Sequence, residues 1–410
     1  MKKALDGIKV IDLSHVLAAP FCTMVLADMG ADVVKVEPPV HGDDSRAFGP
    51  FYDAKEGGEK QSGYFISINR NKRSVCLDLK KEKGKSILRE MIQSADVLVE
   101  NFRPTTMKKL GFSYDELKKI NPKIIYCSIC GFGHDALPGY ATRPAYDMVA
   151  QAFSGLMSIT GPEGGPPVRV GTSVGDIIAG HQAVIGILSA LHYRNISGRG
   201  QHVDISMVDG LVYILENAIV RYTSQNEIPE PLGSAHPTIT PFQGFKTKDG
   251  SWIITPIGND ILWGKFCKAI EREDLTAHEL YRTNPLRTEN KKALIPILEI
   301  EMAKKTSDEW LEIFSSSGIP CSPLNTIDKI VDDPNIKYRN MIVEFEQPGV
   351  GPVKTAGSPF HLSETPGGVY SPAPLLGQHT VSYLEEELGY SREKIEEILN
   401  EGVVFCNSEN

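Results

Sequence analysis

The first 130 residues alternate between short apolar stretches of strand character and longer stretches of helix character. Strands are expected at 8–13, 31–37, 74–79, 96–100 and 123–128, with helices at about 20–29 and 84–94. This alternation is typical of parallel sheets in which crossover helices cover both faces. It therefore constrains the chain to an α/β fold of the doubly wound type.

The loop after the first expected strand argues against one familiar ligand of such folds. His15-Val16-Leu17-Ala18-Ala19-Pro20 replaces the G-x-G-x-x-G loop that lets a dinucleotide pyrophosphate approach the backbone. A nicotinamide-dependent oxidoreductase is therefore disfavoured, although the second strand ends in the acidic residue Glu37.

The rest of the chain predicts further elements and one change of composition. Short helices are expected at 105–110 and 113–120, and Ser113 with Glu116 has the pattern of a capping box. The stretch 224–241 is rich in Pro, Ser, Asn and Glu, which is typical of a linker. Other expected elements are a core helix at 177–191, a strand at 202–206, a helix at 207–222, a hairpin at 242–257, helices near 260–271, 289–303 and 307–317, strands within 341–361 and a helical tail at 379–401.

Composition excludes several classes of partner. The net charge of −9 over 410 residues disfavours nucleic acid. Seven cysteines with a lone CxxC, Cys127 to Cys130, predict reduced thiols and no metal site. The N-terminus lacks a signal peptide, and the one long apolar stretch suits a core helix better than a membrane span. We therefore expect a cytoplasmic protein that binds no membrane.

Asp176 has the setting that points most directly to chemistry. It follows Gly175 in a glycine-rich, largely apolar stretch, and no lysine is close in sequence. A carboxylate in such surroundings must be partnered, protonated or functional, because burying an unpaired charge is expensive. The helical pattern that begins at Ile177 favours a helix N-cap on spacing alone. The glycines allow close approach of a ligand and favour a catalytic role.

Nine stretches in the same order resemble the class III CoA-transferase family, which includes formyl-CoA transferase and carnitine CoA-transferase. The matching stretches are 5–10, 26–37, 69–74, 99–104, 143–147, 170–180, 198–201, 318–321 and 373–377. The resemblance implies a Rossmann-like large domain, built from residues 1–222 and 330–410, with a linker and an inserted smaller α+β domain at 223–329. It also implies that two subunits interlock as rings in a homodimer.

The resemblance implies a covalent mechanism and no tightly bound cofactor. The family's nucleophile is an aspartate at the position of Asp176, which attacks an acyl-CoA donor and forms an acyl-aspartyl anhydride. The CoA thiolate then forms an aspartyl-CoA thioester, from which CoA passes to a small carboxylic acid acceptor. Backbone N–H groups near Gly175 or in the following helix are expected to stabilise the oxyanions.

The resemblance, together with the need of anionic CoA for cations, also predicts the residues that bind CoA. Lys72 and Arg73 precede a strand-like segment, and Asn101, Phe102 and Arg103 follow one; loops at strand ends are where open α/β sheets bind ligands. The other candidates are His15, Val16, Ala18, Lys35, Arg46 and Tyr146.

Three alternatives remain open from the sequence. An α-methylacyl-CoA racemase would use a histidine where this chain has Tyr146, and tyrosine is a poor base near neutral pH. An acyl-CoA hydrolase would use the same aspartyl intermediate with water as acceptor. A non-catalytic CoA-binding protein would not need Asp176 in its glycine-rich setting.

Overall fold

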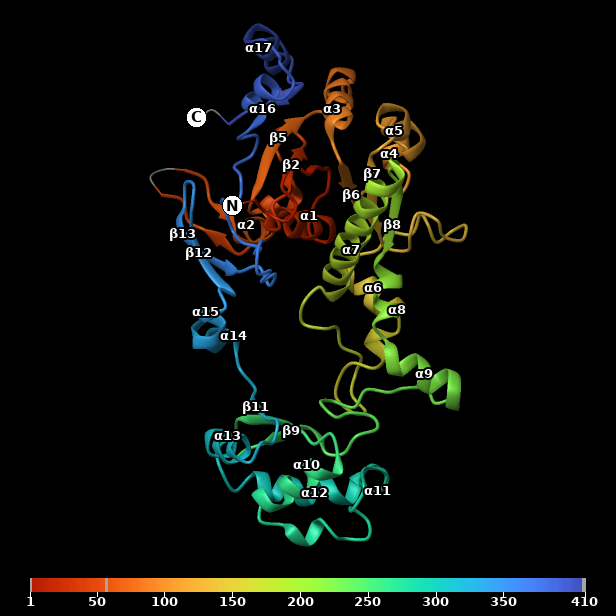
Figure 1. The fold of residues 1–410 in the computed structure, drawn as a ribbon, viewed down its shortest axis with the longest axis vertical. Helices are drawn as coiled ribbons and strands as arrows, with labels where there is room; N and C mark the ends of the chain where they lie inside the picture. Colours follow the sequence, from red (N-terminus) through yellow and green to blue (C-terminus); the bar gives the residue numbers. More distant parts are fainter. Residues whose placement is uncertain (1, 56–57, 408–410) are drawn as a thin grey trace. The chain divides into compact units, whose positions relative to one another are not determined.

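The computed structural model describes residues 2–55 and 58–407. They form two compact units (Figure 1). The first unit contains residues up to Leu156, residues Val170–Ile219 and residues from Pro334 onward, and the second contains Met157–Arg169 and Val220–Asp333. The domain boundaries and the interlocked dimer expected from the sequence stay predictions.

A seven-stranded sheet forms the centre of the first unit. Its strand order is β14-β5-β2-β1-β6-β7-β8, and all neighbours are parallel except β14 with β5. The strands are β1 (Lys9–Asp12), β2 (Asp32–Glu37), β5 (Lys72–Leu77), β6 (Val97–Glu100), β7 (Ile125–Cys130), β8 (His202–Ser206) and β14 (Val404–Phe405). Chain order runs outward from β1 in both directions, which confirms the expected α/β fold with a mainly parallel sheet. The order reverses between β1 and β6, and ligands bind at such switch points.

Alternate residues of the central strands pack on opposite faces of the sheet. Val10 belongs to the apolar core that holds α1 (Ala18–Asp28) and α7 (Val174–Ser197). The next residue, Ile11, belongs to the core that holds α3 (Glu82–Ser94) and the C-terminal helices. This alternation follows from the two-residue repeat of a strand, so both faces are buried, as a parallel sheet requires.

The remaining elements of the first unit surround this sheet. They are β3 (Phe51–Tyr52), β4 (Gln61–Ser62), α2 (Gly63–Asn69), α4 (Thr106–Leu110), α5 (Tyr114–Ile120), α6 (Asp147–Phe153), α8 (Met207–Tyr213), α15 (Pro334–Tyr338), β12 (Ile342–Gln347), β13 (Gly351–Ala356), α16 (Thr380–Glu386) and α17 (Arg392–Asn400). The sequence did not predict α2 or α6. The helix expected at 207–222 is divided into α8 and α9 (Glu216–Gln225), because Glu216 has a positive φ of 27° that interrupts the helix.

The second unit has its own sheet and core. The hairpin expected at 242–257 is confirmed as β9 (Phe242–Lys246) and β10 (Trp252–Pro256), and β11 (Ser322–Pro323) pairs with β10. Its helices include α10 (Asp260–Ala269), α11 (Asn284–Glu289), α12 (Lys291–Met302), α13 (Ser307–Ser316) and α14 (Ile327–Asp332). Trp263, Trp310 and Phe314 are fully buried at the centre of this core.

One expected helix cap is only half formed. The Ser113 hydroxyl accepts from the backbone N–H of Glu116, but the Glu116 side chain pairs with Lys119 instead of returning to the cap. A full capping box occurs at Thr306 and Glu309, where both hydrogen bonds are present.

Helix α7 is long and apolar enough to cross a membrane by length and composition. It packs against α1 and the sheet through buried Ala179, Ala183 and Ile187, and a core helix passes the same test. Location in the cytoplasm stays a prediction.

Gly180 sets the approach of α7 to α1, because a Cβ atom there would lie 2.7 Å from the carbonyl oxygen of Ala18 and 2.9 Å from Cδ1 of Phe21. We expect Gly180→Ala to lower the free energy of unfolding by about 1–3 kcal/mol, despite alanine's higher helix propensity. The matched control is Gly264→Ala inside α10, where the nearest atom is 4.0 Å away and a gain of up to about 1 kcal/mol is expected. Urea unfolding measures both, and a stabilising Gly180→Ala would contradict the packing argument.

Candidate active site

Asp176 lies in the first turn of α7 and is the third residue after the N-cap residue. The N-cap residue is Ser173, so the alternative interpretation of Asp176 as the cap is wrong. Within the part of the chain that the structure describes, the Asp176 carboxylate has no hydrogen-bond or ion-pair partner, and its side chain is half-buried. The carboxylate is therefore available for a role outside the fold.

Asp147, the first residue of α6, accepts a hydrogen bond from the backbone at the start of α7. Its Oδ1 atom accepts from the N–H of Gly175 at 2.8 Å, and its Oδ2 atom accepts from Nε2 of Gln151 at 2.8 Å. The Oε1 atom of Gln151 accepts from the N–H of Val170 at 2.9 Å. A Cβ atom at position 175 would lie only 3.0 Å from Asp147 Oδ1, so glycine allows this close approach. The N–H of Gly175 itself donates to Asp147, so the expectation of an oxyanion donor falls on the N–H groups that follow it in the helix and stays a prediction.

The electrostatic setting of Asp176 is unusual for an aspartate. Burial raises the pKa of its carboxyl to about 7, and the negative charge of Asp147 adds to the rise. Tyr64 of α2 is in electrostatic reach: burial and the charges of Asp176, Asp43 and Asp147 raise the pKa of its hydroxyl to about 12. Asp176 can thus gain or lose a proton near neutral pH, while Tyr64 stays a hydrogen-bond donor.

A cavity of about 280 Å³ opens at the carboxyl ends of β1, β2, β5 and β6. Its apolar lining includes Leu77, Leu79, Phe102 and Leu110, and its polar lining includes His15, Asp43, Asp44 and Lys80. This is the switch point of the sheet, where chain order reverses between β1 and β6.

The structure brings three of the predicted residues together at this cavity. The rings of His15 and Phe102 line it, with centroids 5.5 Å apart. Asn101 bridges the two loops, since its amide bonds both the N–H and the carbonyl of His15. Val16 follows with a φ of +66°, a strained value for a β-branched residue, and its N–H donates to Asp43 at 3.0 Å. Arg103 is exposed next to Phe102.

Three cationic side chains that were predicted to bind CoA form ion pairs with buried carboxylates instead. Lys72 is buried, and its ammonium donates to Asp12 at 3.0 Å and also to the carbonyl of Pro20 and the amide oxygen of Asn69. Lys35 pairs with Asp43 at 2.8 Å, and Arg46 forms a bidentate pair with Glu37. Sequence could not show that Lys72 is buried, because its partner Asp12 lies 60 residues away along the chain. Lys35 and Arg46 thus pair with Asp43 and Glu37, which line the cavity, and their charges are not free for a ligand.

The other predicted residues lie away from the cavity. Arg73 is at the amino end of β5 and pairs with Asp32, so the stretches 71–74 and 101–103 adjoin opposite ends of the sheet. Ala18 is buried, and its carbonyl faces Gly180. Tyr146 is 81% exposed.

Sequence reasoning missed several residues of the site, among them Tyr64, Lys80, Leu110 and Asp147. Lys80 stood out only as part of a charged run typical of a solvated helix start. Asp147 had a detectable signal, because it directly follows Tyr146 in one of the stretches that resemble the family.

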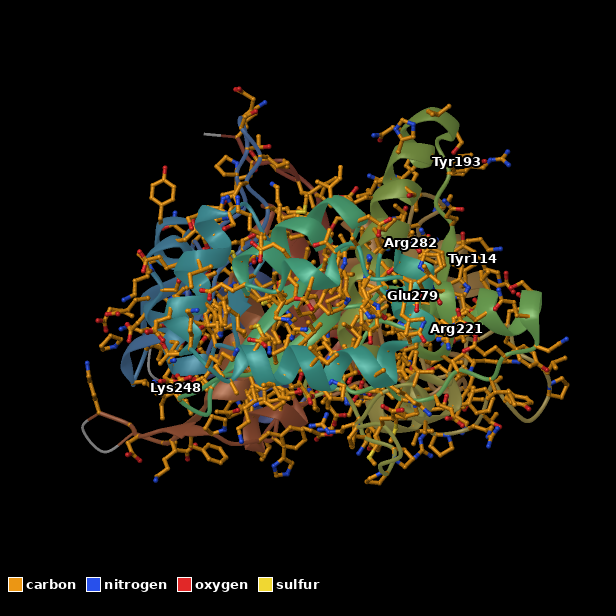
Figure 2. All side chains as sticks on the ribbon, turned by 90° about the horizontal axis from the view of Figure 1, so that it is seen from below. Tyr114, Tyr193, Arg221, Lys248, Glu279 and Arg282 are labelled. Atoms are coloured by element: carbon orange, nitrogen blue, oxygen red, sulfur yellow. The ribbon has the colours of Figure 1, made fainter. Side chains whose placement is uncertain are left out.

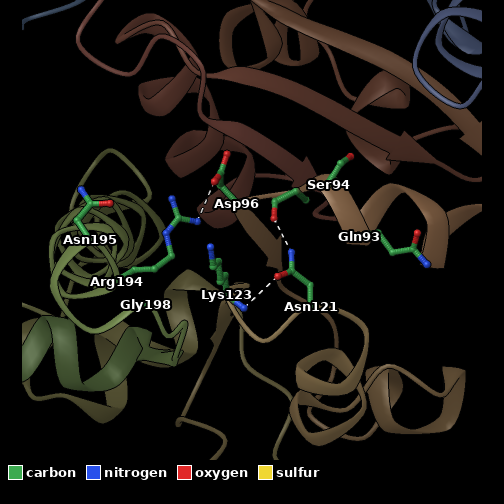
Figure 3. A pocket seen from close by; sticks show the side chains of 9 residues that line it. Gln93, Ser94, Asp96, Asn121, Lys123, Arg194, Asn195 and Gly198 are labelled. Carbon is green, nitrogen blue, oxygen red and sulfur yellow. Dashed lines mark hydrogen bonds and ion pairs between the residues drawn. The ribbon is translucent and has the colours of Figure 1, made fainter.

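A larger polar cavity, of about 500 Å³, lies at the amino ends of β6 and β7 (Figure 3). Its guanidinium, Arg194, is paired with Asp96 at 2.8 Å, and the Asn121 amide donates to the carbonyls of Ile92 and Ala95. The lining groups thus largely satisfy one another. Within residues 2–55 and 58–407 no group of three His, Cys, Asp or Glu side chains is placed to hold a metal ion.

Comparison with known proteins identifies the class of enzyme. The model of CoA-transferase family III matches residues 5–380. The human succinyl-CoA:glutarate CoA-transferase is 38% identical over 402 residues, 98% of this chain and 90% of that protein. An acetyl-CoA:oxalate CoA-transferase of Acetobacter aceti is 41% identical over 363 residues, 88% of this chain and 90% of that protein. The crystal structure of a CaiB/BaiF family protein from Brucella suis superposes with a TM-score of 0.83 at 36% identity, covering 94% of this chain and all of that one.

Fold and relatives together define an enzyme that transfers CoA between acyl groups. The chain belongs to CoA-transferase family III. The family predicted from the nine sequence stretches is confirmed.

Because Asp147 contributes negative charge, we expect Asp147→Asn to lower the pKa of the Asp176 carboxyl from about 7 by roughly one unit. The asparagine oxygen can still accept from Gly175, while the hydrogen bond from Gln151 Nε2 is lost. NMR titration of protein labelled with ¹³C in its aspartate carboxyls measures the shift, with the signal assigned by its loss in Asp176→Ala. Asp209→Asn, which removes an exposed carboxylate at the start of α8, should leave that pKa unchanged. An unshifted pKa in Asp147→Asn would contradict the charge coupling.

Proposed function

We propose that this protein moves CoA from an acyl-CoA donor to a carboxylic acid acceptor, with Asp176 as the nucleophile. The observation that carries the proposal is the partnerless, half-buried carboxylate in the first turn of α7. A carboxylate whose pKa is raised to about 7 by burial is less well stabilised by its surroundings, and so more nucleophilic, than one in water.

The reaction proceeds through four acyl exchanges. A carboxylate oxygen of Asp176 attacks the thioester carbonyl, the C–S bond breaks, and CoA leaves as thiolate from an acyl-aspartyl anhydride. The thiolate attacks the aspartyl carbonyl, releasing the donor acid and leaving an aspartyl-CoA thioester. The acceptor carboxylate attacks that thioester and again expels the thiolate. The thiolate then attacks the acceptor carbonyl, which forms the product acyl-CoA and regenerates Asp176.

The start of α7 offers one donor for the tetrahedral oxyanions. The backbone N–H of Asp176 has no acceptor in the described part of the chain, whereas the N–H of Gly175 donates to Asp147. A free N–H at a helix N-terminus favours negative charge. The protonated hydroxyl of Tyr64 is a second donor for substrate oxygens in this region.

The cavity at the switch point takes the nucleotide part of CoA. Leu77, Leu79 and Leu110, with Phe102, form an apolar slot for adenine. Lys80 lines the cavity and Arg103 is exposed beside Phe102, and neither has an ion-pair partner among the described residues. These two cations are free to bind phosphates.

The acceptor is proposed to be a small dicarboxylic acid. Two relatives of this chain are named for glutarate and oxalate as acceptors, and both acids are dicarboxylates. The alternatives, racemase and hydrolase, gain no support from the site. His134 lies beside Glu100, and His181 packs edge-on against Phe21 at 5.0 Å.

The active form is proposed to be the interlocked homodimer. Large apolar side chains are exposed along α7 and neighbouring helices of the first unit, among them Ile185 (64%), Ile196 (75%) and Tyr213 (83%), and Tyr193, labelled in Figure 2. Many exposed large apolar side chains on neighbouring helices support the proposal that a partner covers this surface.

Mass spectrometry of intact protein after incubation with succinyl-, acetyl- or butyryl-CoA tests the mechanism. We expect a covalent acyl or CoA adduct that peptide mapping places on Asp176. Asp176→Ala should form no adduct and lose CoA exchange by about 10³-fold or more. Asp176→Asn is avoided because deamidation would restore the carboxylate. Normal exchange by Asp176→Ala would refute the proposal; CoA release without acceptor would indicate a hydrolase, and α-deuterium exchange without an adduct a racemase.

Light scattering tests the dimer. We expect twice the chain mass of 45.0 kDa at micromolar concentration. Because interlocked chains cannot separate without unfolding, dilution to nanomolar concentration should not yield folded monomer. A folded, active species of single-chain mass would contradict the assembly.

A further inference from the structure

A buried carboxylate lies behind the wall of the CoA cavity. Glu100, the last residue of β6, is fully buried. Its Oε2 atom accepts from the backbone N–H of Phe102 at 2.6 Å, and its Oε1 atom accepts from the hydroxyl of Tyr126 at 2.6 Å. No lysine or arginine pairs with it in residues 2–55 and 58–407, and Nε2 of His134 is 3.8 Å away, beyond hydrogen-bond distance.

Tyr126 is itself held firmly by its neighbours. Its ring stacks on His202 at 4.8 Å and on Tyr114, labelled in Figure 2, at 6.2 Å. The contact from Glu100 therefore connects the loop after β6 to an aromatic cluster formed by residues of α5, β7 and β8.

Asn101 completes the connection on the other side. Its Oδ1 atom accepts from the N–H of His15 at 2.9 Å, and its Nδ2 atom donates to the carbonyl of His15 at 2.8 Å. Both ends of the amide are thus used by one residue of the loop after β1. The two residues whose rings line the cavity, His15 and Phe102, are each fixed by a side chain that lies behind them.

We propose that Glu100 and Asn101 are positioning residues that hold His15 and Phe102 in the arrangement that binds the CoA nucleotide, without touching it. The proposal rests on the function proposed above and deepens it. It gives Asn101 a role different from the direct CoA contact that the family resemblance implies.

The loop needs an acceptor oxygen at position 100 and not a charge. Burial raises the pKa of Glu100 to about 7, so both protonation states occur near neutral pH. Either state can keep an oxygen facing Phe102 N–H, because the Tyr126 hydroxyl can rotate to accept a proton from the acid. Glutamine offers the same oxygen to Phe102 and an N–H to Tyr126, whereas leucine offers neither.

The test compares Glu100→Leu, Glu100→Gln and a matched control. We expect Glu100→Leu to raise KM for acyl-CoA and the calorimetric Kd for CoA about tenfold, with kcat within about twofold, since one buried N–H loses its acceptor. Glu100→Gln should stay within about twofold of the wild type in both constants. Glu90→Leu also removes a carboxylate that accepts from a tyrosine hydroxyl, that of Tyr390, but away from the cavity, and should leave KM unchanged.

Each outcome decides the proposal. An unchanged KM in Glu100→Leu, or an equal rise in Glu100→Gln, overturns it. If Glu100→Leu does not fold, Asn101→Asp replaces it: the aspartate cannot donate to the His15 carbonyl and should raise KM in the same way, and an unchanged KM overturns the proposal. A wild-type protein that forms no adduct and binds no CoA would remove the proposed function itself. Wild-type binding with a normal Glu100→Leu removes only the positioning role.

Discussion

The pairing of buried charges beneath the carboxyl edge of the sheet is the constraint on which the rest of the site depends. Asp12, at the end of β1, pairs with Lys72; Lys35 pairs with Asp43. Glu37 and Arg46 complete the network with a bidentate pair. Removing these charges from water is costly, and the network is tolerable only because each carboxylate has a cation. Although burial opposes it, Lys72 and Lys35 lower the pKa of Asp12.

The same network shapes the backbone around the cavity. Lys35 also donates to the carbonyl of Ser14 at 2.7 Å, and Asp43 receives the N–H of Val16. These contacts hold the loop after β1 in a conformation that includes a left-handed valine. Such strain persists only where the surroundings over-determine it, and it is characteristic of functional loops. A dinucleotide enzyme has glycines in this loop, whereas here Lys35 and Asp43 hold the loop through hydrogen bonds to its backbone.

Sequence reasoning identified the parallel sheet because strand and helix periodicities are local, and each repeats several times before residue 130. It failed where the deciding interaction is distant in sequence. Lys72 was expected to meet CoA, but its partner Asp12 becomes a neighbour only when β2 lies between β1 and β5. Arg46 was also expected to meet CoA, and its pairing with Glu37, nine residues earlier, has no sign in the sequence pattern. Helix α6 was missed because its role, to place Asp147 against Gly175, depends on a contact 28 residues away. Asp176 was recognisable from the sequence because the features that set it apart, its glycine-rich and largely apolar flanks, are residues next to it in the chain.

The absence of a side chain at position 180 has a mechanical consequence. The backbones of α1 and α7 approach there so closely that a methyl group would not fit between them. Asp176 stands one helical turn before this contact, and the loop that ends at His15 and Val16 stands just before Ala18. One glycine thus sets the position of the proposed nucleophile relative to the loop beside the cavity that is proposed to bind the nucleotide. In the proposed reaction, the distance that the pantetheine arm of CoA must span, from the cavity to Asp176, would be determined by the point at which α1 and α7 come into contact.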